Sequence, residues 1–219
     1  MGGGSPGLSG AACLASQAAL RTGAGLVTLG VPESLHQLME VKLTEVMTAP
    51  LPEAEDGTFG FGAAGTILER AGRADALAVG PGLGRGEELP HLLAQLVRET
   101  SVPTVIDADG LNALVGQTDI LRSATAPIIL TPHPGEMARL CESTVAEVQA
   151  HRLPLACELA KEWKVWLVLK GASSIVATPE GVCYINSSGG PALATGGSGD
   201  VLTGIIVSLL AQGLAPKEA

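Results

Sequence analysis

The sequence predicts an α/β fold with a mostly parallel β-sheet covered by helices. Short apolar runs typical of strands alternate along the chain with longer stretches typical of helices, which is the pattern of consecutive βαβ units. Hydrophobic residues make up 46% of the chain and aromatic residues only 2%. The core therefore consists mainly of Val, Leu, Ile and Ala, as in a parallel sheet buried on both faces. With 219 residues, the chain is expected to form one domain over residues 1–219.

Five short aliphatic segments are predicted to be strands. They are residues 25–31, 76–80, 103–108, 127–131 and 165–171. Residues 173–186 differ, because two short apolar runs flank the turn sequence PEG. A small antiparallel hairpin is expected there, within an otherwise parallel sheet.

Seven segments are predicted to be helices: residues 8–22, 33–41, 64–72, 87–99, 134–141, 144–162 and 200–212. Thr144, followed three residues later by Glu147, has the spacing of a capping box, so one helix is expected to begin there. The Gly-rich and acidic stretch 51–65 is expected to form a loop.

Charge and cysteine usage exclude several classes of protein. The net charge is -9 and the pI is near 4.9, which argues against binding to nucleic acid or to an anionic membrane, since both need a basic surface. No apolar run approaches the roughly 20 residues of a membrane span. Cys13, Cys141, Cys157 and Cys183 form no CxxC pair, so we expect buried free thiols and neither a disulfide nor a zinc site. Together these features predict a cytoplasmic protein.

Polar or glycine-rich turns follow four of the predicted strands. They read GPGLGRG at 80–86, DADGLNAL at 107–114, TPHPGEMARL at 131–140 and KGASS at 170–174, and GGPALATGGSGDVLTG at 189–204 adds a fifth. In a doubly wound sheet, ligands bind at the carboxyl ends of the parallel strands. The five turns are therefore expected to share one edge of the sheet and to form the binding site.

Most of these turns also have a purely structural interpretation. The glycines of GPGLG serve a tight turn or the close approach of a ligand. Asp107 and Asp109 cap the following helix or bind Mg²⁺, and Glu136 complements a helix dipole or contacts a metal or water. For His133, which lies between two prolines, a ligand contact is favoured over a structural role. For Lys170, a phosphate contact is favoured over a surface position.

The glycine-rich turn before residue 200 carries the strongest chemical signal. Glycines leading into a helix offer unpaired N–H groups and the positive end of the helix dipole, which together suit a phosphate. Asp200, in the first turn of that helix, would repel a phosphate. Its position is understandable if the carboxylate accepts a proton from a hydroxyl that attacks the phosphate. The structural alternative is a favourable first-turn acid.

The GxGD sequence that opens this late helix is similar to the signature of the ribokinase-like superfamily. Six segments, GAGLVTL, VGPGLGRG, VIDADGLNAL, TPHPGEMARL, LKGASSIVATPEG and ATGGSGDVLTG, resemble more specifically the ADP- or ATP-dependent NAD(P)H-hydrate dehydratases. The resemblance covers essentially the whole chain and implies a three-layer αβα fold. It also implies a carbon-oxygen lyase of metabolite repair: a nucleotide phosphorylates the ring hydroxyl of hydrated NADH or NADPH, phosphate leaves, and Mg²⁺ assists. Bacterial members mostly convert ADP to AMP.

The resemblance assigns roles to individual residues. Asp200 is implied as the catalytic base and as a substrate contact, together with Ala24, Gly82 or Gly84, and His133. The nucleotide site is implied at Lys170, Gly171, Ala172, Ser173, Ser174, Gly196, Gly197, Ser198 and Gly199. The metal ligands stay open, with Asp107, Asp109 and Glu136 as candidates.

The chain departs from the family pattern in two places. GGPALATGG stands where GNPGMATGG is common, so Gly190 and Ala192 differ and an asparagine amide is absent. The opening GGGSPGLSGA has no full strand before it. The family's domain also usually continues into further helices beyond residue 219, so we expect a domain truncated at both ends. The resemblance also implies a homo-oligomer, and an NAD(P)H-hydrate epimerase as a fused or separate partner. Two alternatives remain: a small-molecule alcohol kinase of the same superfamily, and a nucleotide-binding module without catalysis.

Overall fold

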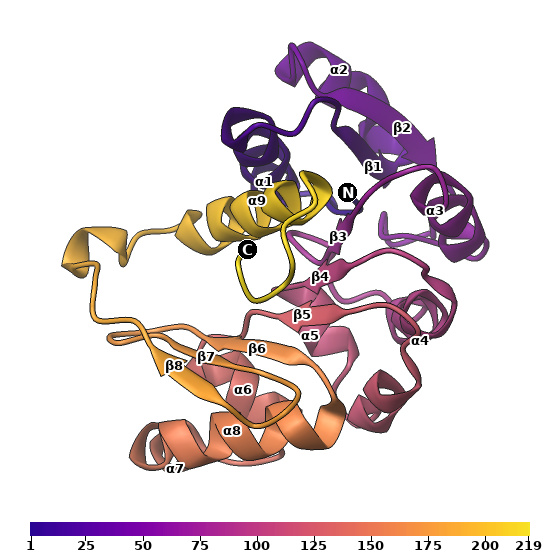
Figure 1. Ribbon diagram of the computed structural model, residues 1–219. Helices are drawn as coiled ribbons and strands as arrows, with labels where there is room; N and C mark the ends of the chain where they lie inside the picture. Colours follow the sequence, from indigo (N-terminus) through magenta and orange to yellow (C-terminus); the bar gives the residue numbers. More distant parts are fainter.

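The computed structural model describes residues 1–219 as a sheet with helices on both faces (Figure 1). Its strands are β1 Thr28–Pro32, β2 Met47–Leu51, β3 Leu77–Val79, β4 Thr104–Ile106, β5 Ile128–Leu130, β6 Trp166–Leu169, β7 Ile175–Ala177 and β8 Cys183–Ile185. Strands β3 to β8 form a six-stranded sheet in chain order, and β1 and β2 pair separately. The pairs from β3 to β6 are parallel, whereas β6–β7 and β7–β8 are antiparallel. The predicted parallel sheet and its terminal hairpin are both confirmed.

The helices lie between the strands in the expected order. They are α1 Ser9–Thr22, α2 His36–Lys42, α3 Ala63–Ala71, α4 Leu89–Glu99, α5 Asp109–Ala113, α6 Pro134–Leu140, α7 Val145–Ala150, α8 Arg152–Trp163 and α9 Ser198–Ala211, with the 3-10 turns η1 Glu33–Leu35, η2 Thr118–Ser123 and η3 Pro191–Leu193. Thr144 caps α7 in a capping box with Glu147, as predicted. The expected helix 144–162 is divided at His151, whose φ of -125° interrupts the helical backbone. The short strand β2 was not predicted; it contains Pro50, which is tolerated where a strand lies at a sheet edge.

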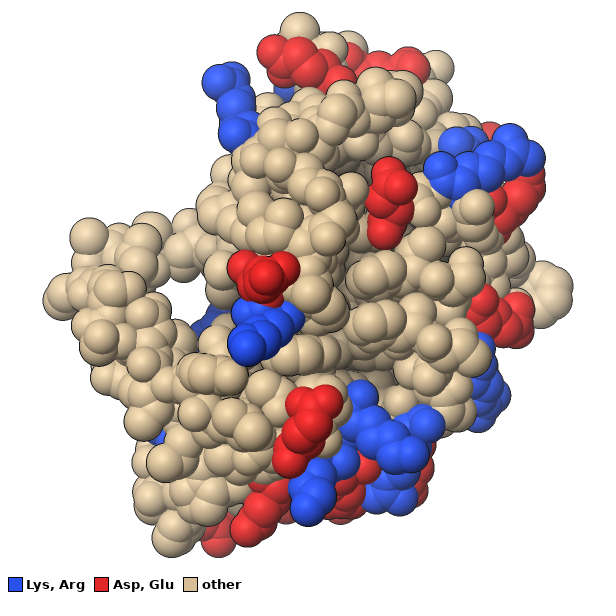
Figure 2. All heavy atoms as spheres, viewed as in Figure 1, with Lys and Arg blue, Asp and Glu red and all other residues tan.

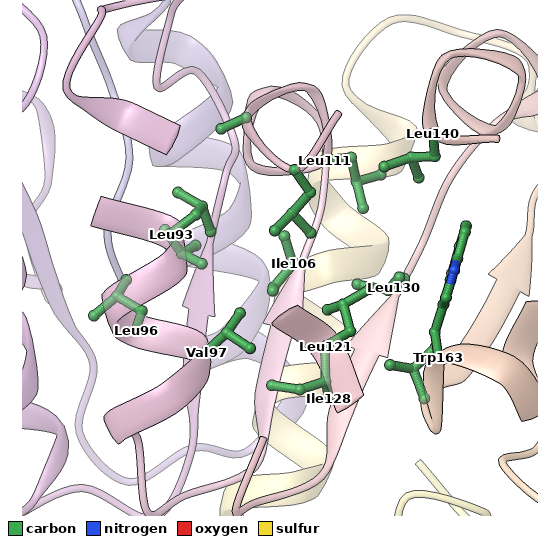
Figure 3. Packing of buried hydrophobic residues seen from close by; sticks show 14 of the residues in the cluster. Leu93, Leu96, Val97, Ile106, Leu111, Leu121, Ile128, Leu130, Leu140 and Trp163 are labelled. Atoms are coloured by element: carbon green, nitrogen blue, oxygen red, sulfur yellow. The ribbon is translucent and has the colours of Figure 1, made fainter. Parts of the chain in front are cut away.

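Alternating residues of the central strands face two separate hydrophobic cores. Val79, Ile106 and Leu130 belong to the core under α3, α4, α5, α6 and α8, and their neighbours Ala78 and Val105 belong to the core under α1 and α9. Figure 3 shows the first core, with side chains from α4 lying against β4. This alternation follows from the two-residue period of a strand and makes the sheet the middle of three layers.

Helices α1 and α9 lie side by side over one face of the sheet (Figure 1). They approach so closely that a Cβ atom on Gly204 would overlap the backbone carbonyl of Ala15 and crowd the Cβ of Ala18. Glycine at this position therefore sets the distance between the two helices, and α9 carries Asp200 at its first turn.

The first residues of the chain lie between β1 and β3. Gly2 forms parallel bridges to both Gly30 and Val79, with Gly2 donating to the Ala78 carbonyl at 2.8 Å and Gly30 donating to the Met1 carbonyl at 2.7 Å. Beside this short segment is a cavity of about 740 Å³, lined in part by the first residues of β1 and β3. The extended segment at Gly2 thus joins the β1–β2 sheet to the six-stranded sheet, but it pairs with only a few residues of β1 and β3.

The cysteine prediction was wrong for two residues. Cys157 of α8 and Cys183 of β8 form a disulfide with their Cα atoms 6.0 Å apart, whereas Cys13 is a buried free thiol and Cys141 a partly exposed one. The hairpin folds back against α8 and brings together two cysteines that are 26 residues apart. Sequence spacing alone carries no information on such a tertiary contact.

No helix has both the length and the apolar character needed to cross a bilayer. Figure 2 shows one face of the molecule, on which basic side chains are scattered and several lie next to acidic ones. This face offers no continuous basic surface of the kind that nucleic acids require.

Candidate functional site

A buried ion pair joins the carboxyl ends of β4 and β6. Asp107 is 1% exposed; its Oδ1 lies 2.9 Å from Nζ of Lys170, and its Oδ2 accepts a hydrogen bond from Thr203 of α9 at 2.7 Å. A buried carboxylate is stable only when it is paired and hydrogen-bonded, and both conditions are met here. Lys170 is therefore no surface lysine: its side chain is directed into the site.

The start of α6 adds a second carboxylate. Oε2 of Glu136 accepts a hydrogen bond from the backbone N–H of His133 at 2.8 Å and lies 3.8 Å from Nζ of Lys170. Nδ1 of His133 accepts from the backbone N–H groups of Gly135 and Glu136, so His133 is the N-cap of α6. Its side chain is still half exposed. His133 thus has the structural role that sequence reasoning ranked second, and its predicted ligand contact stays a prediction.

Asp109 is held by a different set of groups. It accepts hydrogen bonds from the backbone N–H of Gly84 at 2.9 Å and from the side chain of Asn112 at 3.2 Å. Neither Asp109 nor Asp107 caps α5 through its side chain. Both carboxylates tie neighbouring turns together instead, which is a third role beside the two considered from sequence.

Asp200 lies in the first turn of α9, three residues after the N-cap Gly197, which has a φ of +88°. The pKa of Asp200 is raised above its ordinary value, first by burial and next by the charge of Asp107, while Lys170 opposes the shift. A carboxylate with a raised pKa is a better proton acceptor than an exposed one. The site therefore contains a group suited to general base catalysis.

The glycine-rich segment before α9 is exposed from residue 186 to residue 196 and extends away from the body of the molecule (Figure 1). The N–H groups of Gly196 and Gly197 donate to no backbone carbonyl, and the first N–H groups of a helix have no partner inside it. A cluster of free donors at the positive end of a helix is a phosphate-binding arrangement.

The turn from Lys170 to Ser174 is held by a residue that sequence reasoning missed. Arg152, at the start of α8, approaches the backbone carbonyls of Leu169, Lys170 and Ser173 at 3.3 to 3.5 Å. Gly171 and Ser173 have positive φ values of 139° and 53°. Arg152 thus fixes a turn of unusual conformation. Because Arg152 is far from this turn in sequence, no local pattern indicated the contact.

The other predicted site residues are distributed unevenly. Gly84 lies beside Asp109, but Gly82 is buried, and a Cβ there would meet the carbonyl of Leu8. Ala24 precedes β1 and lines the 740 Å³ cavity at the amino ends of the strands. The structure therefore does not bring Ala24 together with Asp200. Thr203 was missed, although its position three residues after Asp200 places both on one helix face.

No set of three or more His, Cys, Asp or Glu side chains converges closely enough to hold a metal ion. Asp107, Asp109 and Glu136 each already bind a protein donor. Mg²⁺ commonly binds through one or two carboxylates together with waters and substrate phosphates. The residues present fit that mode and do not form a complete protein cage.

Comparison with known proteins assigns the chain to a family. The family model described as NAD(P)H-hydrate dehydratase matches residues 2–219. The chain is 50% identical over 217 residues to the bifunctional NAD(P)H-hydrate repair enzyme Nnr of Moorella thermoacetica, covering 99% of this chain and 41% of that protein. It is 37% identical to the ADP-dependent (S)-NAD(P)H-hydrate dehydratase of Bacillus subtilis, covering 99% of this chain and 73% of that protein. The chain thus spans about two fifths of the bifunctional relative.

Solved structures agree with these matches. The ADP/ATP-dependent NAD(P)H-hydrate dehydratase of Bacillus subtilis, co-crystallised with ATP/Mg²⁺, has a TM-score of 0.79 and 34% identity over 98% of this chain and 72% of that chain. Phosphofructokinase-2 of Escherichia coli, at 16% identity, has a TM-score of 0.64 over 94% of this chain and 76% of that chain, and shares the fold alone. A ribokinase-like superfamily protein of Enterococcus faecalis has a TM-score of 0.75 and 27% identity over 96% of this chain and 70% of that chain. The fold is therefore ribokinase-like, and the chain belongs to the NAD(P)H-hydrate dehydratase family.

Proposed function

We propose that this protein dehydrates hydrated NADH or NADPH at the expense of an adenine nucleotide. The observation that carries the proposal is the position of Asp200, in the first turn of α9, after a turn with free N–H donors and beside the Lys170–Asp107 pair. A base next to an anion site is what phosphorylation of a hydroxyl requires. Family membership supports the same reaction.

The proposed reaction has two steps. Asp200 accepts the proton of the ring hydroxyl while the hydroxyl oxygen attacks the terminal phosphoryl group, and the bond between that phosphorus and the nucleotide breaks. The carbon–oxygen bond then breaks, inorganic phosphate leaves with the former hydroxyl oxygen, and a ring proton is lost as the double bond forms. The sum is hydrated dinucleotide plus ADP giving NAD(P)H, AMP and phosphate; with ATP the product is ADP.

Two elements of this chain would bind the phosphates and the nucleotide: the glycine-rich start of α9 and the turn that follows β6. The N–H groups of Gly196, Gly197 and Gly199 would stabilise the negative charge on the transferring phosphoryl group, whereas the N–H of Ser198 donates to the carbonyl of Thr195. The turn from Lys170 to Ser174, which is exposed at residues 171–173, would contact the nucleotide, and Arg152 keeps that turn in place. The half-exposed His133 would contact the dinucleotide.

Magnesium belongs to this proposal as an ion that arrives with the nucleotide. It would neutralise charge on the phosphates, which are its preferred ligands beside carboxylates and water. The carboxylates nearest to Lys170, those of Asp107 and Glu136, are the protein groups available to it.

The remaining parts of the proposal concern context. The bifunctional relatives are named NAD(P)H-hydrate repair enzymes, which supports an NAD(P)H-hydrate epimerase as a functional partner. A cytoplasmic location and a homo-oligomeric state are proposed with it. The second is supported by strand β8, which presents the exposed apolar side chains of Tyr184 and Ile185.

The test is an assay with hydrated NADH or NADPH, Mg²⁺, and ADP, ATP or no nucleotide. Absorbance of the reduced nicotinamide ring is expected to recover only with a nucleotide, with release of one phosphate for each ring restored. If the absorbance recovers with neither ADP nor ATP, the proposal is overturned. A stable phosphorylated product without phosphate release would indicate an alcohol kinase instead.

A further inference from the structure

A second hollow lies next to the candidate site and has no role in the chemistry described above. It has a volume of about 310 Å³ and is lined by the apolar residues Leu89, Ala113 and Val115, by two arginines, Arg85 and Arg139, and by Asp109 and Asn112, which hydrogen-bond to each other. A hollow in which a few charged and polar groups converge beside apolar side chains is typical of a site for a small organic ligand.

Neither Arg85 nor Arg139 forms an ion pair; among the arginines of this chain, only Arg73 and Arg122 do. What distinguishes Arg85 and Arg139 from the other unpaired arginines is that both line this hollow. Both are exposed. Two guanidinium groups that lack a protein carboxylate are free to bind an anion from solution, and their planar forks match a phosphate group.

Arg139 is held in a defined direction. Its Nε donates to Oδ1 of Asn112 at 2.9 Å, Asn112 donates to Asp109 at 3.2 Å, and Asp109 accepts from the backbone of Gly84 at 2.9 Å. This chain of bonds links the turns after β3, β4 and β5. It leaves the two terminal nitrogens of Arg139 free of such a bond while fixing the position of the guanidinium group.

Arg85 is placed by its two neighbours. Gly84 has a φ of +80°, and a Cβ on Gly84 or Gly86 would crowd Thr58. The turn is therefore packed against Thr58, and both Gly84 and Gly86 line the hollow with Arg85.

The hollow adjoins the proposed reaction centre on the side away from the nucleotide turn. Arg139 follows Glu136 by one helical turn, and Glu136 lies 3.8 Å from Nζ of Lys170. The residues of the hollow come from the turns after β3 and β4 and from α4, α5 and α6. The proposed nucleotide residues follow β6 and precede α9.

We propose that Arg85 and Arg139 bind a phosphate group of the dinucleotide substrate. The inference rests on the proposed function, because that function supplies a dinucleotide whose hydrated ring lies at Asp200. Two phosphates of this substrate have the required chemistry: the pyrophosphate that joins its halves and, in NADPH alone, the 2′-phosphate. The apolar residues of the hollow would contact the attached ribose or adenine.

A binding experiment tests the anion site without any turnover. Inorganic pyrophosphate is titrated calorimetrically into the wild type, Arg85→Gln, and Arg85→Gln/Arg139→Gln, with Arg98→Gln as the matched control. Arg98 is also exposed and lacks an ion pair, but it lies at the end of α4 and outside the hollow. The Kd for pyrophosphate at the proposed site is expected to rise at least about tenfold in the Arg85 and double variants and to stay unchanged in Arg98→Gln. Identical isotherms for all four proteins would overturn the proposal.

Steady-state kinetics then identify the phosphate. In the Arg85 and double variants, the KM for the hydrated dinucleotide is expected to rise about tenfold while the KM for ADP stays unchanged. A rise with hydrated NADPH alone assigns the 2′-phosphate, and an equal rise with hydrated NADH assigns the pyrophosphate. If the wild type shows no turnover, the proposed function fails and the titration still decides on the anion site. A higher KM for ADP with an unchanged KM for both dinucleotides would overturn the inference.

Discussion

Nζ of Lys170, at the end of β6, lies 2.9 Å from Oδ1 of Asp107, at the end of β4, although the two residues are 63 positions apart in sequence. The other oxygen of the same carboxylate accepts a hydrogen bond from Thr203 of α9. One buried carboxylate thus links two strands to the helix that carries Asp200. A Cβ on Gly199 would lie 3.3 Å from Nζ of Lys170, so the ammonium group also lies against the start of α9.

Replacing Lys170 by methionine is expected to destabilise the protein by about 3–5 kcal/mol, because it leaves the charge of Asp107 buried without its cation. Urea unfolding measures the effect. Lys217→Met is the matched control, since Lys217 is exposed and forms no ion pair. The double variant Lys170→Met/Asp107→Asn is expected to regain part of the loss. Equal stability of Lys170→Met and Lys217→Met would show that the pair is not buried as described.

Replacing Gly204 by alanine is expected to cost about 1–3 kcal/mol, because the added methyl group overlaps the backbone of α1 at Ala15. Gly10→Ala in α1 is the control: a Cβ there meets no atom within 4 Å, so helix propensity alone predicts a gain of up to about 1 kcal/mol. Thermal unfolding of the two variants should therefore move in opposite directions. Equal shifts would argue against close contact of α1 and α9.

The disulfide predicts a simple thiol count. The chain has four cysteines, of which Cys13 and Cys141 are free. Titration of the unfolded, unreduced protein should give two thiols for each chain, and Cys157→Ser should raise the count to three by releasing Cys183. Four thiols without a reductant would contradict the Cys157–Cys183 bond.

The cavity between β1 and β3 predicts that a strand joined ahead of Met1 will stabilise the fold. Gly2 already pairs with both neighbouring strands in parallel, so four apolar β-branched residues placed before Met1 would continue both ladders and bury apolar side chains worth about 1.5–3 kcal/mol each. A Gly-Ser extension of equal length is the control. Equal unfolding midpoints for the two extensions would contradict the prediction.

The buried α-amino group of Met1 makes the stability of the fold depend on pH. Burial lowers the pKa of the α-amino group of Met1 from 8.0 to about 6. Between these values the unfolded chain binds more protons than the folded one, so stability should rise as the pH increases from about 6 to 8. Extension of the N-terminus removes this amine, and the rise should disappear. A rise that persists in the extended protein would have to come from another group.

Much of the fold followed from local patterns. The aliphatic strands, the PEG hairpin and the capping box at Thr144 are written in short stretches of sequence, and the structure has them. Strand β2 was missed because Pro50 and its polar neighbours give no strand pattern, and it is defined only by pairing with β1. The disulfide was missed for the same kind of reason, since it depends on a tertiary contact.

The sequence predicted where the candidate site lies in the fold, but not which side chains contact one another there. Strand ends brought Asp107, Glu136, Lys170 and Asp200 together, because parallel strands share their carboxyl edge. The role of His133 as a helix cap and of Arg152 as a support for the nucleotide turn depends on side-chain geometry. Glycines pose the same difficulty: Gly82 makes room for Leu8, and from sequence that reason is indistinguishable from ligand contact.

The most direct test of the proposed mechanism is the turnover of Asp200→Asn compared with the wild type across pH. Burial raises the pKa of Asp200, so wild-type turnover should fall as the pH drops through this raised value, where the base becomes protonated. Asp200→Asn should still bind the nucleotide, and it should be at least as stable at neutral pH, because the substitution removes a partly buried charge. Its kcat should fall about 10²–10⁴-fold, and the decrease of turnover at low pH should disappear. A variant that turns over within about twofold of the wild type and keeps the same pH profile would contradict the assignment of Asp200 as the base.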